Sequence, residues 1–167
     1  MSSPVLTVMT AAVRKAARSL QRDYGELANL QVSQKAPGDY VTAADQKVDK
    51  FLREELAKVR PGYAFLTEET GAVPGTDPEH RFIIDPIDGT RAFVAGLTSW
   101  TTLIGAVAGD RPILGIIDQP WIDERYIGLT DAEKSSWQEG RGARISLKTR
   151  DCRKLTDAIL STTLEKA

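Results

Sequence analysis

Apolar residues recur at helical spacing over the first part of the chain, between about Val5 and Ala28. Basic residues occupy the other faces of the same segment, among them Arg14 and Arg18. This pattern predicts one long amphipathic helix that turns its apolar side to a core. The positions that form the apolar stripe are Leu6, Met9, Val13, Ala16, Ala17 and Leu20.

A second helix is predicted to begin near Thr42, after a turn-rich loop at residues 35–40. Thr42 suits the N-cap position, and Asp45 three residues later completes a variant of the capping box with Asp in place of Glu. The sequence 60–62, Arg-Pro-Gly, ends the helix. Its apolar face is formed by Ala44, Val48, Phe51, Leu52 and Leu56.

The pattern then changes to short apolar runs that are typical of strands. Gly109 and Asp110 separate two of these runs, which predicts a hairpin with a two-residue turn. The runs cover residues 63–66, 81–84, 99–108, 112–118, 125–129 and 158–160, and a polar segment at 130–142 is expected to be a loop. The pattern thus predicts two helices followed by several strands.

Composition narrows the class of protein further. The chain has 167 residues, 41% of them hydrophobic and 27% charged, which is typical of a globular domain and not of a disordered or membrane protein. The net charge is −1, from 22 basic and 23 acidic residues, so neither nucleic acid nor a membrane surface is an expected partner. The single cysteine and the absence of a secretory pattern at the N-terminus favour a reducing, cytoplasmic location.

Residues 82–90 carry the strongest chemical signal in the sequence. An apolar run ends at Asp85, and Asp88 follows three residues later across Pro86 and Ile87. Two carboxylates so close repel each other unless a cation or a proton lies between them, and Mg²⁺ prefers oxygen ligands. Glu68 ends the preceding strand-like run, so a shared strand edge would give a site of three carboxylates.

Neighbouring residues extend this candidate site. Gly89 lets the backbone approach a ligand closely, and Thr90 with Arg91 can open a short helix whose amides suit a phosphate. Asp45 is a candidate fourth carboxylate, although its place in the capping box is a sufficient structural reason for an acid there. Taken singly, an Asp-Gly pair is most often a turn and Glu68 an exposed strand end. The combination favours a site.

The run Asp85 to Thr90, followed by Arg91-Ala92-Phe93, resembles the first signature of the inositol monophosphatase family of metal-dependent sugar-phosphate phosphatases. The Glu68-Glu69 pair and the run 41–45, Val-Thr-Ala-Ala-Asp, match the family in the same order. The segments 89–93 and 115–120 and the pair Glu124-Arg125 resemble the bacterial histidinol-phosphatase branch. The resemblance implies an α+β fold, the family's αβαβα sandwich with two N-terminal helices against a largely antiparallel sheet. This chain would be its N-terminal part.

The resemblance also implies a role for each site residue. Glu68, Asp85 and the Ile87 carbonyl would hold a first Mg²⁺, and Asp85 with Asp88 would help to hold a second. The Gly89 and Thr90 amides would bind phosphate. Independently of the resemblance, Arg91 is a candidate contact to the polar part of the substrate, although an exposed arginine after a turn is as often structural. The Thr90 hydroxyl, bonded to Asp45, would orient the attacking water with help from Glu68. Lys35 corresponds to a loop lysine of the family.

A second family signature, Trp-Asp followed by small residues, has no counterpart after Thr90. The sequence therefore predicts a metal- and phosphate-binding domain at residues 1–142 and the beginning of a second α/β domain at 143–167. The family's last metal ligand lies in that second signature, so activity of these residues alone is not expected.

The predicted activity is the Mg²⁺-dependent hydrolysis of a small phosphorylated metabolite, of the histidinol phosphate or inositol monophosphate type, by metal-activated water. The resemblance also implies a homodimer. Two alternatives stay open. One is a non-catalytic module that binds metal or phosphate. The other is a haloacid-dehalogenase-like phosphatase, in which Asp85 would be the nucleophile. In such enzymes one residue separates the two acids, whereas two separate Asp85 from Asp88 here.

Overall fold

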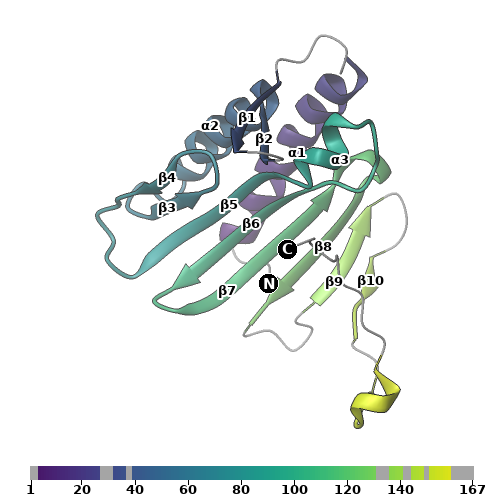
Figure 1. Cartoon of the computed structure of the whole chain (residues 1–167). Coiled ribbons are helices and arrows are strands. Elements are labelled where there is room, and N and C mark those ends of the chain that lie inside the picture. Colours follow the sequence, from purple (N-terminus) through teal and green to yellow (C-terminus); the bar gives the residue numbers. More distant parts are fainter. Residues whose placement is uncertain are drawn as a thin grey trace.

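A computed structural model describes residues 4–26, 32–36, 39–130, 136–140, 144–148 and 151–158 of the chain. Two long helices lie against one face of a broad sheet, and a short helix lies near the end of two central strands (Figure 1). The helices are α1, Pro4–Gly25, α2, Ala43–Ala57, and α3, Thr90–Val94. Two 3₁₀ turns, η2 at Pro120–Ile122 and η3 at Leu155–Asp157, complete the described helical segments.

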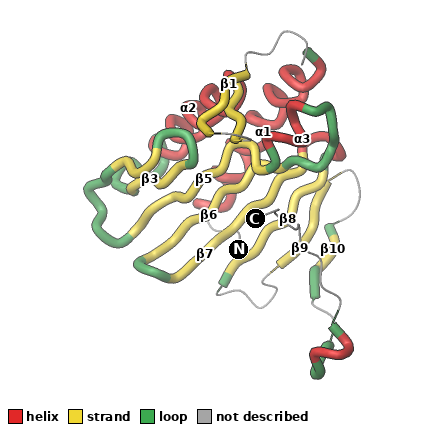
Figure 2. Tube along the Cα trace, viewed as in Figure 1, coloured by secondary structure: helices red, strands yellow, loops and turns green. Residues whose placement is uncertain are grey.

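The large sheet contains eight strands in the order β10-β9-β8-β7-β6-β5-β3-β4. Figure 2 shows these strands in yellow, side by side. Among the described strands only β3 and β5 run parallel, and each other neighbouring pair is antiparallel. The strands are β3 Ala64–Thr67, β4 Gly71–Val73, β5 His80–Asp88, β6 Thr101–Ala108, β7 Arg111–Gln119, β8 Glu124–Leu129, β9 Ser136–Gly140 and β10 Ile145–Ser146. The α+β fold predicted from the sequence is confirmed.

The core lies between the two long helices and the sheet. Met9, Val13 and Leu20 of α1 are fully buried, as are Leu52 and Leu56 of α2, and they meet the inward residues of the central strands. Alternation along each strand sends every second side chain to this face. The apolar residues that recur at helical spacing in the sequence are therefore the residues that pack into the core.

Helix α2 begins as the sequence predicts. The Thr42 hydroxyl accepts hydrogen bonds from the amides of Ala44 and Asp45, and the Asp45 carboxylate accepts one from the Thr42 amide at 2.8 Å. This is a complete capping box with Asp at the third helical position. The cap fixes the first turn of α2, and with it the place of Asp45.

Three local expectations are wrong. Residues 35–40, expected to be a loop, contribute to an antiparallel hairpin of β1, Val32–Ala36, and β2, Asp39–Thr42. The polar segment 130–142 contains strand β9, because pairing to the edge of β8 needs backbone groups and no apolar pattern. Strand β5 does not end at Asp85 but continues to Asp88 through a register shift opposite β6.

The outer face of the sheet, opposite the long helices, carries exposed apolar side chains. Leu66, Ile83 and Ile117 are each at least 40% exposed. Gly105, Gly115 and Gly128 are paired in register across β6, β7 and β8, which leaves a shallow hollow over these strands. None of the helices in the described part of the chain is long and apolar enough to cross a membrane.

Strand β10 bears on the predicted division of the chain at residue 142. Ile145 and Ser146 pair with Gln138 and Trp137 of β9, so the large sheet extends past that residue. The run at 158–160 lies almost wholly outside the described residues. The division into two domains stays a prediction.

Candidate active site

Parallel pairing of β3 and β5 brings two carboxylates together at one end of the sheet. Thr67 is the register partner of Ile84, and the Glu68 amide donates to the Ile84 carbonyl at 3.2 Å. Glu68 and Asp85 directly follow this pair of register partners, so their side chains leave the sheet side by side. The sequence predicted this meeting from the two strand ends, and it is the central relationship of the site.

Asp85 stands in an environment that disfavours its charge. Burial raises its pKa first, and the nearby carboxyl groups of Glu68, Asp88 and Asp45 raise it further, to about 7. Its carboxyl group is close enough to that of Glu68 for the two to share a proton. One of its oxygens, Oδ1, is buried without a hydrogen-bond partner. Like charges at this spacing call for a proton or a cation between them.

The segment between Asp85 and Asp88 is held rigidly by neighbouring residues. Pro86 and Ile87 are buried, and the Thr102 hydroxyl donates to the Pro86 carbonyl at 2.8 Å. Asp88 itself is exposed and accepts from the Thr101 hydroxyl at 3.3 Å. The register shift places the two aspartates three residues apart around an anchored bulge, which is the stiff connection that the sequence predicted in the form of a turn.

Gly89 connects this bulge to helix α3. Its φ of +88° lies in the left-handed region, and a Cβ at this position would stand 2.9 Å from the Ser99 carbonyl oxygen. Both facts require glycine. The first amides of a helix have no acceptor within the helix, so the Gly89–Thr90 backbone is a place where an anion can bind. Arg91 follows on the exposed side of α3.

The expected hydrogen bond between the Thr90 hydroxyl and Asp45 is not formed in this structure. Thr90 Oγ1 donates to the Ile87 carbonyl at 2.9 Å, because α3 folds back over the bulge. Oδ2 of Asp45 accepts from the amide and hydroxyl of Thr42 instead, at 2.8 and 2.5 Å. The other oxygen, Oδ1, is buried without a partner.

Asp45 nonetheless belongs electrostatically to the same cluster. Burial is the main cause that raises its pKa, to about 6, while the hydrogen bonds from Thr42 lower it and the charge of Glu69 raises it. Its charge in turn contributes to the raised pKa of Asp85. Asp45 therefore has both the capping role and a place beside the acidic site, the two possibilities that the sequence left open.

The donor set suits a hard divalent cation. Within the described ranges no group of three acidic, histidine or cysteine side chains is close enough to form a finished metal cage. Four carboxyl groups nevertheless act on one another around Asp85, and an oxygen of Asp85 and one of Asp45 lack partners. Oxygen atoms that are crowded, acidic and unpartnered are what Mg²⁺ binds, usually together with several waters.

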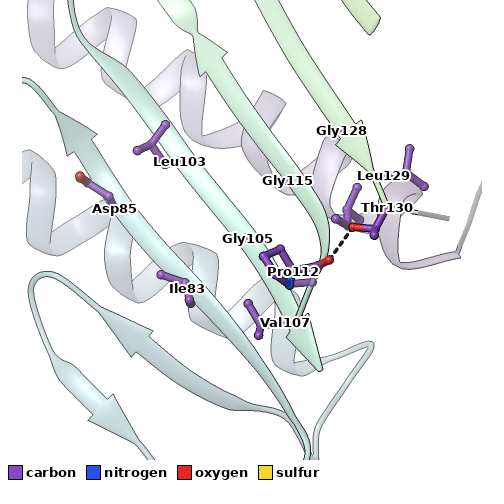
Figure 3. Close-up of a pocket in the computed structure, with 12 residues that line it drawn as sticks. Ile83, Asp85, Leu103, Gly105, Val107, Pro112, Gly115, Gly128, Leu129 and Thr130 are labelled. Carbon is purple, nitrogen blue, oxygen red and sulfur yellow. Dashed lines mark hydrogen bonds between the residues drawn. The ribbon is translucent and has the colours of Figure 1, made fainter. Parts of the chain in front are cut away.

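A hollow of about 550 Å³ on the outer face of the sheet reaches Asp85 (Figure 3). Asp85 and Ile83 project from β5 into this side, and the far end is closed by Pro112 and Thr130, which are joined by a hydrogen bond. The remaining lining is apolar or glycine. Among the described residues that line this hollow, Asp85 is the one with an ionisable side chain, and the apolar lining contributes to its desolvation.

Two features of the site region were missed by the sequence analysis. Asp49, one helical turn after Asp45, is buried on the same side of α2 and contacts Thr70 beyond the Glu68-Glu69 pair. The spacing of four between the two aspartates is the signal that could have revealed it. The buried ion pair of Asp118 and Arg125, 2.6 Å apart on β7 and β8, is the other. The side chain of Lys35 lies outside the described residues.

Fold and site together define an α+β protein with acidic residues at the ends of a parallel strand pair, beside a glycine-led helix start. The family model for the inositol monophosphatase family matches residues 1–166. The chain therefore belongs to the inositol monophosphatase family, and the family resemblance seen in the sequence is confirmed.

Individual relatives agree with this assignment. The chain is 42% identical over 158 residues to an inositol-1-monophosphatase of Mesorhizobium japonicum, covering 95% of this chain and 57% of that protein. It is 30% identical to the Nus factor SuhB of Haemophilus influenzae, over 96% of this chain and 58% of that protein. The crystal structure of the extragenic suppressor protein suhB from Bartonella henselae superposes with a TM-score of 0.78, at 42% identity, over 85% of this chain and 54% of the other.

The chain thus spans a little under three fifths of the length of the curated relatives it matches. Family membership and fold rest on nearly the whole of this chain. These comparisons do not extend to the activity, substrate or partners of a whole protein of this family.

Proposed function

We propose that the protein which contains this chain hydrolyses a small phosphate monoester with the help of Mg²⁺. The observation that carries the proposal is the meeting of Glu68 and Asp85 at the ends of β3 and β5, with Asp88 and Asp45 near enough to raise the pKa of Asp85. Relatives named inositol-1-monophosphatase support the reaction class.

The residues that would hold Mg²⁺ are Glu68, Asp85, Asp88 and the carbonyl of Ile87. When bound, Mg²⁺ would supply positive charge for the phosphate and lower the pKa of a bound water. The Ile87 carbonyl already accepts from Thr90, so the same bulge that presents the aspartates ties the metal ligands to α3. This connection favours one rigid unit for metal and phosphate binding.

The start of α3 would take the phosphate. The Gly89 and Thr90 amides offer donors where the backbone is closely packed against Ser99, and Arg91 would contact the polar part of the substrate. These donors would remain fixed during the reaction, since the bulge and the hydrogen bond from the Thr90 hydroxyl to the Ile87 carbonyl hold them. Fixed donors stabilise developing negative charge without reorganisation.

Proton removal from the attacking water would fall to Asp45 and Glu68, with the Thr90 hydroxyl orienting the water. Asp45 has a buried oxygen without a partner and a pKa of about 6, which suits a group that accepts a proton near neutral pH. No covalent intermediate on Asp85 is part of this scheme. The scheme therefore differs from a haloacid-dehalogenase mechanism in where the oxygen of the released phosphate comes from.

The test compares two substrates and one variant. We expect Mg²⁺-dependent release of phosphate from inositol 1-phosphate or from histidinol phosphate by the full-length protein, and loss of at least about 100-fold in Asp88→Asn because one ligand is removed. In ¹⁸O-labelled water a single turnover should place label directly in phosphate. A phosphorylated Asp85, or full activity of Asp88→Asn, would overturn the proposal.

A second candidate is a binding role without hydrolysis. It is favoured by relatives that are named Nus factor SuhB. Metal binding by the full-length protein without any release of phosphate would support it.

We also propose that the protein is a homodimer. Sedimentation of the same preparation would measure its oligomeric state.

A further inference from the structure

Asp49 lies in the middle of α2, one turn beyond Asp45, and its side chain is only 2% exposed. Its Oδ2 atom accepts two hydrogen bonds, from Arg53 Nε at 2.9 Å and from the Thr70 hydroxyl at 2.6 Å. Its Oδ1 atom is buried without a partner. A buried carboxylate is costly, so one that is kept away from the proposed metal site needs a reason.

The contact with Thr70 reaches the turn that carries Glu68. Strand β3 ends at Thr67 and β4 begins at Gly71, and these two residues are register partners. The Thr70 amide donates to the Thr67 hydroxyl at 2.9 Å, which closes the turn, and the Thr70 hydroxyl joins the turn to α2. The five residues 67–71 are thus held between the helix and the sheet.

This turn keeps Glu68 in place against electrostatic repulsion from Asp85. Glu68 is exposed, whereas Asp85 beside it is partly buried, and the two carboxyl groups repel when both are charged. The backbone bond from the Glu68 amide to Ile84 fixes one side of the turn. Asp49 and Thr70 fix the other side, at the point where the chain turns back.

We propose that Asp49 is a positioning residue, which acts through the Thr70 hydroxyl to hold the turn 67–71 so that Glu68 stays beside Asp85. The proposal rests on the metal site of the proposed function and adds a residue that does not itself touch the metal. Asp45 and Asp49, both on the buried face of α2, then have different roles. Asp45 faces the reacting groups, and Asp49 secures the loop that brings Glu68 to them.

The test uses Thr70→Val in the full-length protein, because valine keeps the shape of threonine and removes the hydroxyl. Mg²⁺ affinity is measured by isothermal titration calorimetry and independently by Mn²⁺ electron paramagnetic resonance. We expect the dissociation constant to rise about 10-fold, the lower end of the loss that follows removal of a hydrogen-bond partner behind a metal ligand. Thr70→Ser, which restores the hydroxyl, should return it to within twofold of wild type.

A matched control makes the same chemical change elsewhere. Thr130 also donates its hydroxyl to another element, the Pro112 carbonyl, but at the far end of the sheet. Thr130→Val should leave Mg²⁺ affinity unchanged. Hydrogen exchange of the Glu68 amide should become faster in Thr70→Val and stay unchanged in Thr130→Val, which separates a loosened turn from a general loss of stability.

The outcomes distinguish this inference from the proposed function. If wild type binds Mg²⁺ and Thr70→Val binds it equally well, Asp49 and Thr70 do not position Glu68, and the metal site stands without them. If wild type binds no Mg²⁺, the metal site and the positioning role both fall. If Thr70→Ser binds as weakly as Thr70→Val, the hydroxyl is not the connecting group and the inference is wrong.

Discussion

Glu68 and Asp85 are neighbours because the residues before them, Thr67 and Ile84, are partners in the parallel pairing of β3 and β5. One register thus determines whether the acidic site exists. A shift by a single residue would send one of the two side chains to the opposite face.

Removing one charge of this pair should stabilise the protein when no metal is present. In Glu68→Gln the carboxyl group of Asp85 loses its closest like charge, so the free energy of unfolding in EDTA at pH 8 should rise by about 0.5–1.5 kcal/mol. The gain should disappear, or change sign, in 10 mM Mg²⁺, since the variant also loses a ligand. Urea unfolding followed by circular dichroism measures both. Equal stability of variant and wild type in EDTA at pH 8 would show that the two groups do not repel.

Stability without metal should fall as the pH rises from about 4 to 7. The pKa of Asp45 is raised by burial to about 6 and that of Asp118 to about 6, while the unfolded chain titrates near 4. The folded protein therefore binds more protons in this window, and the stability present below pH 4 is lost as the pH passes through about 6. We expect a loss of about 1 kcal/mol or more for each buried group.

The matched variants for this pH dependence are Asp45→Asn and Asp118→Asn, which are neutral at every pH. Each should have a flatter profile between pH 4 and 7 in thermal unfolding measured in EDTA. Glu55 and Asp77 lie at the surface, and their pKa values are lowered by Lys15 and by the Glu79 amide. A lowered carboxyl pKa adds stability as the pH rises toward the unfolded values of 4.5 and 3.8, so their effect has the opposite sign and lies at the acidic end of the window. A wild-type stability that increases steadily from pH 4 to 7 would contradict the assignment.

Gly89→Ala should destabilise the protein and impair the site together. The alanine Cβ would meet the Ser99 carbonyl oxygen at 2.9 Å while φ is +88°, so we expect a loss of about 1–3 kcal/mol in stability. Gly109→Ala is the matched control, because φ there is +57° and nothing lies within 4 Å of the added carbon. It should cost about 1 kcal/mol. Equal losses for the two variants would mean that backbone approach to Ser99 is unimportant.

The ion pair of Asp118 and Arg125 should be far more sensitive to the loss of one partner than to the loss of both. Both side chains are at most 3% exposed, and burial raises the pKa of Asp118 although Arg125 lowers it. Arg125→Met leaves a buried, unpaired carboxyl group and should cost about 3–5 kcal/mol at pH 7.

The double variant Asp118→Leu/Arg125→Met removes both charges. It should recover at least half of the loss seen in Arg125→Met, because no charge is then left alone in the core. Chemical unfolding of the four proteins gives the coupling energy. An additive cycle would show that the pair is not coupled, in spite of its 2.6 Å separation.

The sequence was sufficient to predict the elements whose pattern is written in their own residues. The helical stripe of α1, the capping box at Thr42 and the Gly109-Asp110 hairpin are local, and the structure has all three. The meeting of Glu68 and Asp85 was predictable because each acid closely follows a short run of apolar residues in the sequence. The elements that were predicted correctly are those whose signal lies in residues close together in the sequence.

The elements that could not be predicted depend on partners distant in sequence. Strand β9 is polar and is a strand because β8 offers it a free edge. The Thr90 hydroxyl bonds to Ile87 because of the fold of the bulge, which no spacing reveals. The role of Asp49 was missed because its hydrogen-bond partner, Thr70, lies 21 residues away in the sequence. Tertiary contacts decide such positions, and local propensity does not.

The central claim is that Glu68, Asp85 and Asp88 are gathered to bind a divalent cation. Its most direct test is a calorimetric titration of the metal-free, full-length protein with Mg²⁺ at pH 7, in buffers of different ionisation enthalpy. We predict binding that releases protons from wild type, because the raised pKa of Asp85 leaves protons in the site, and no binding to Asp85→Asn. Binding of equal strength to both proteins, or no binding to wild type, would contradict the account.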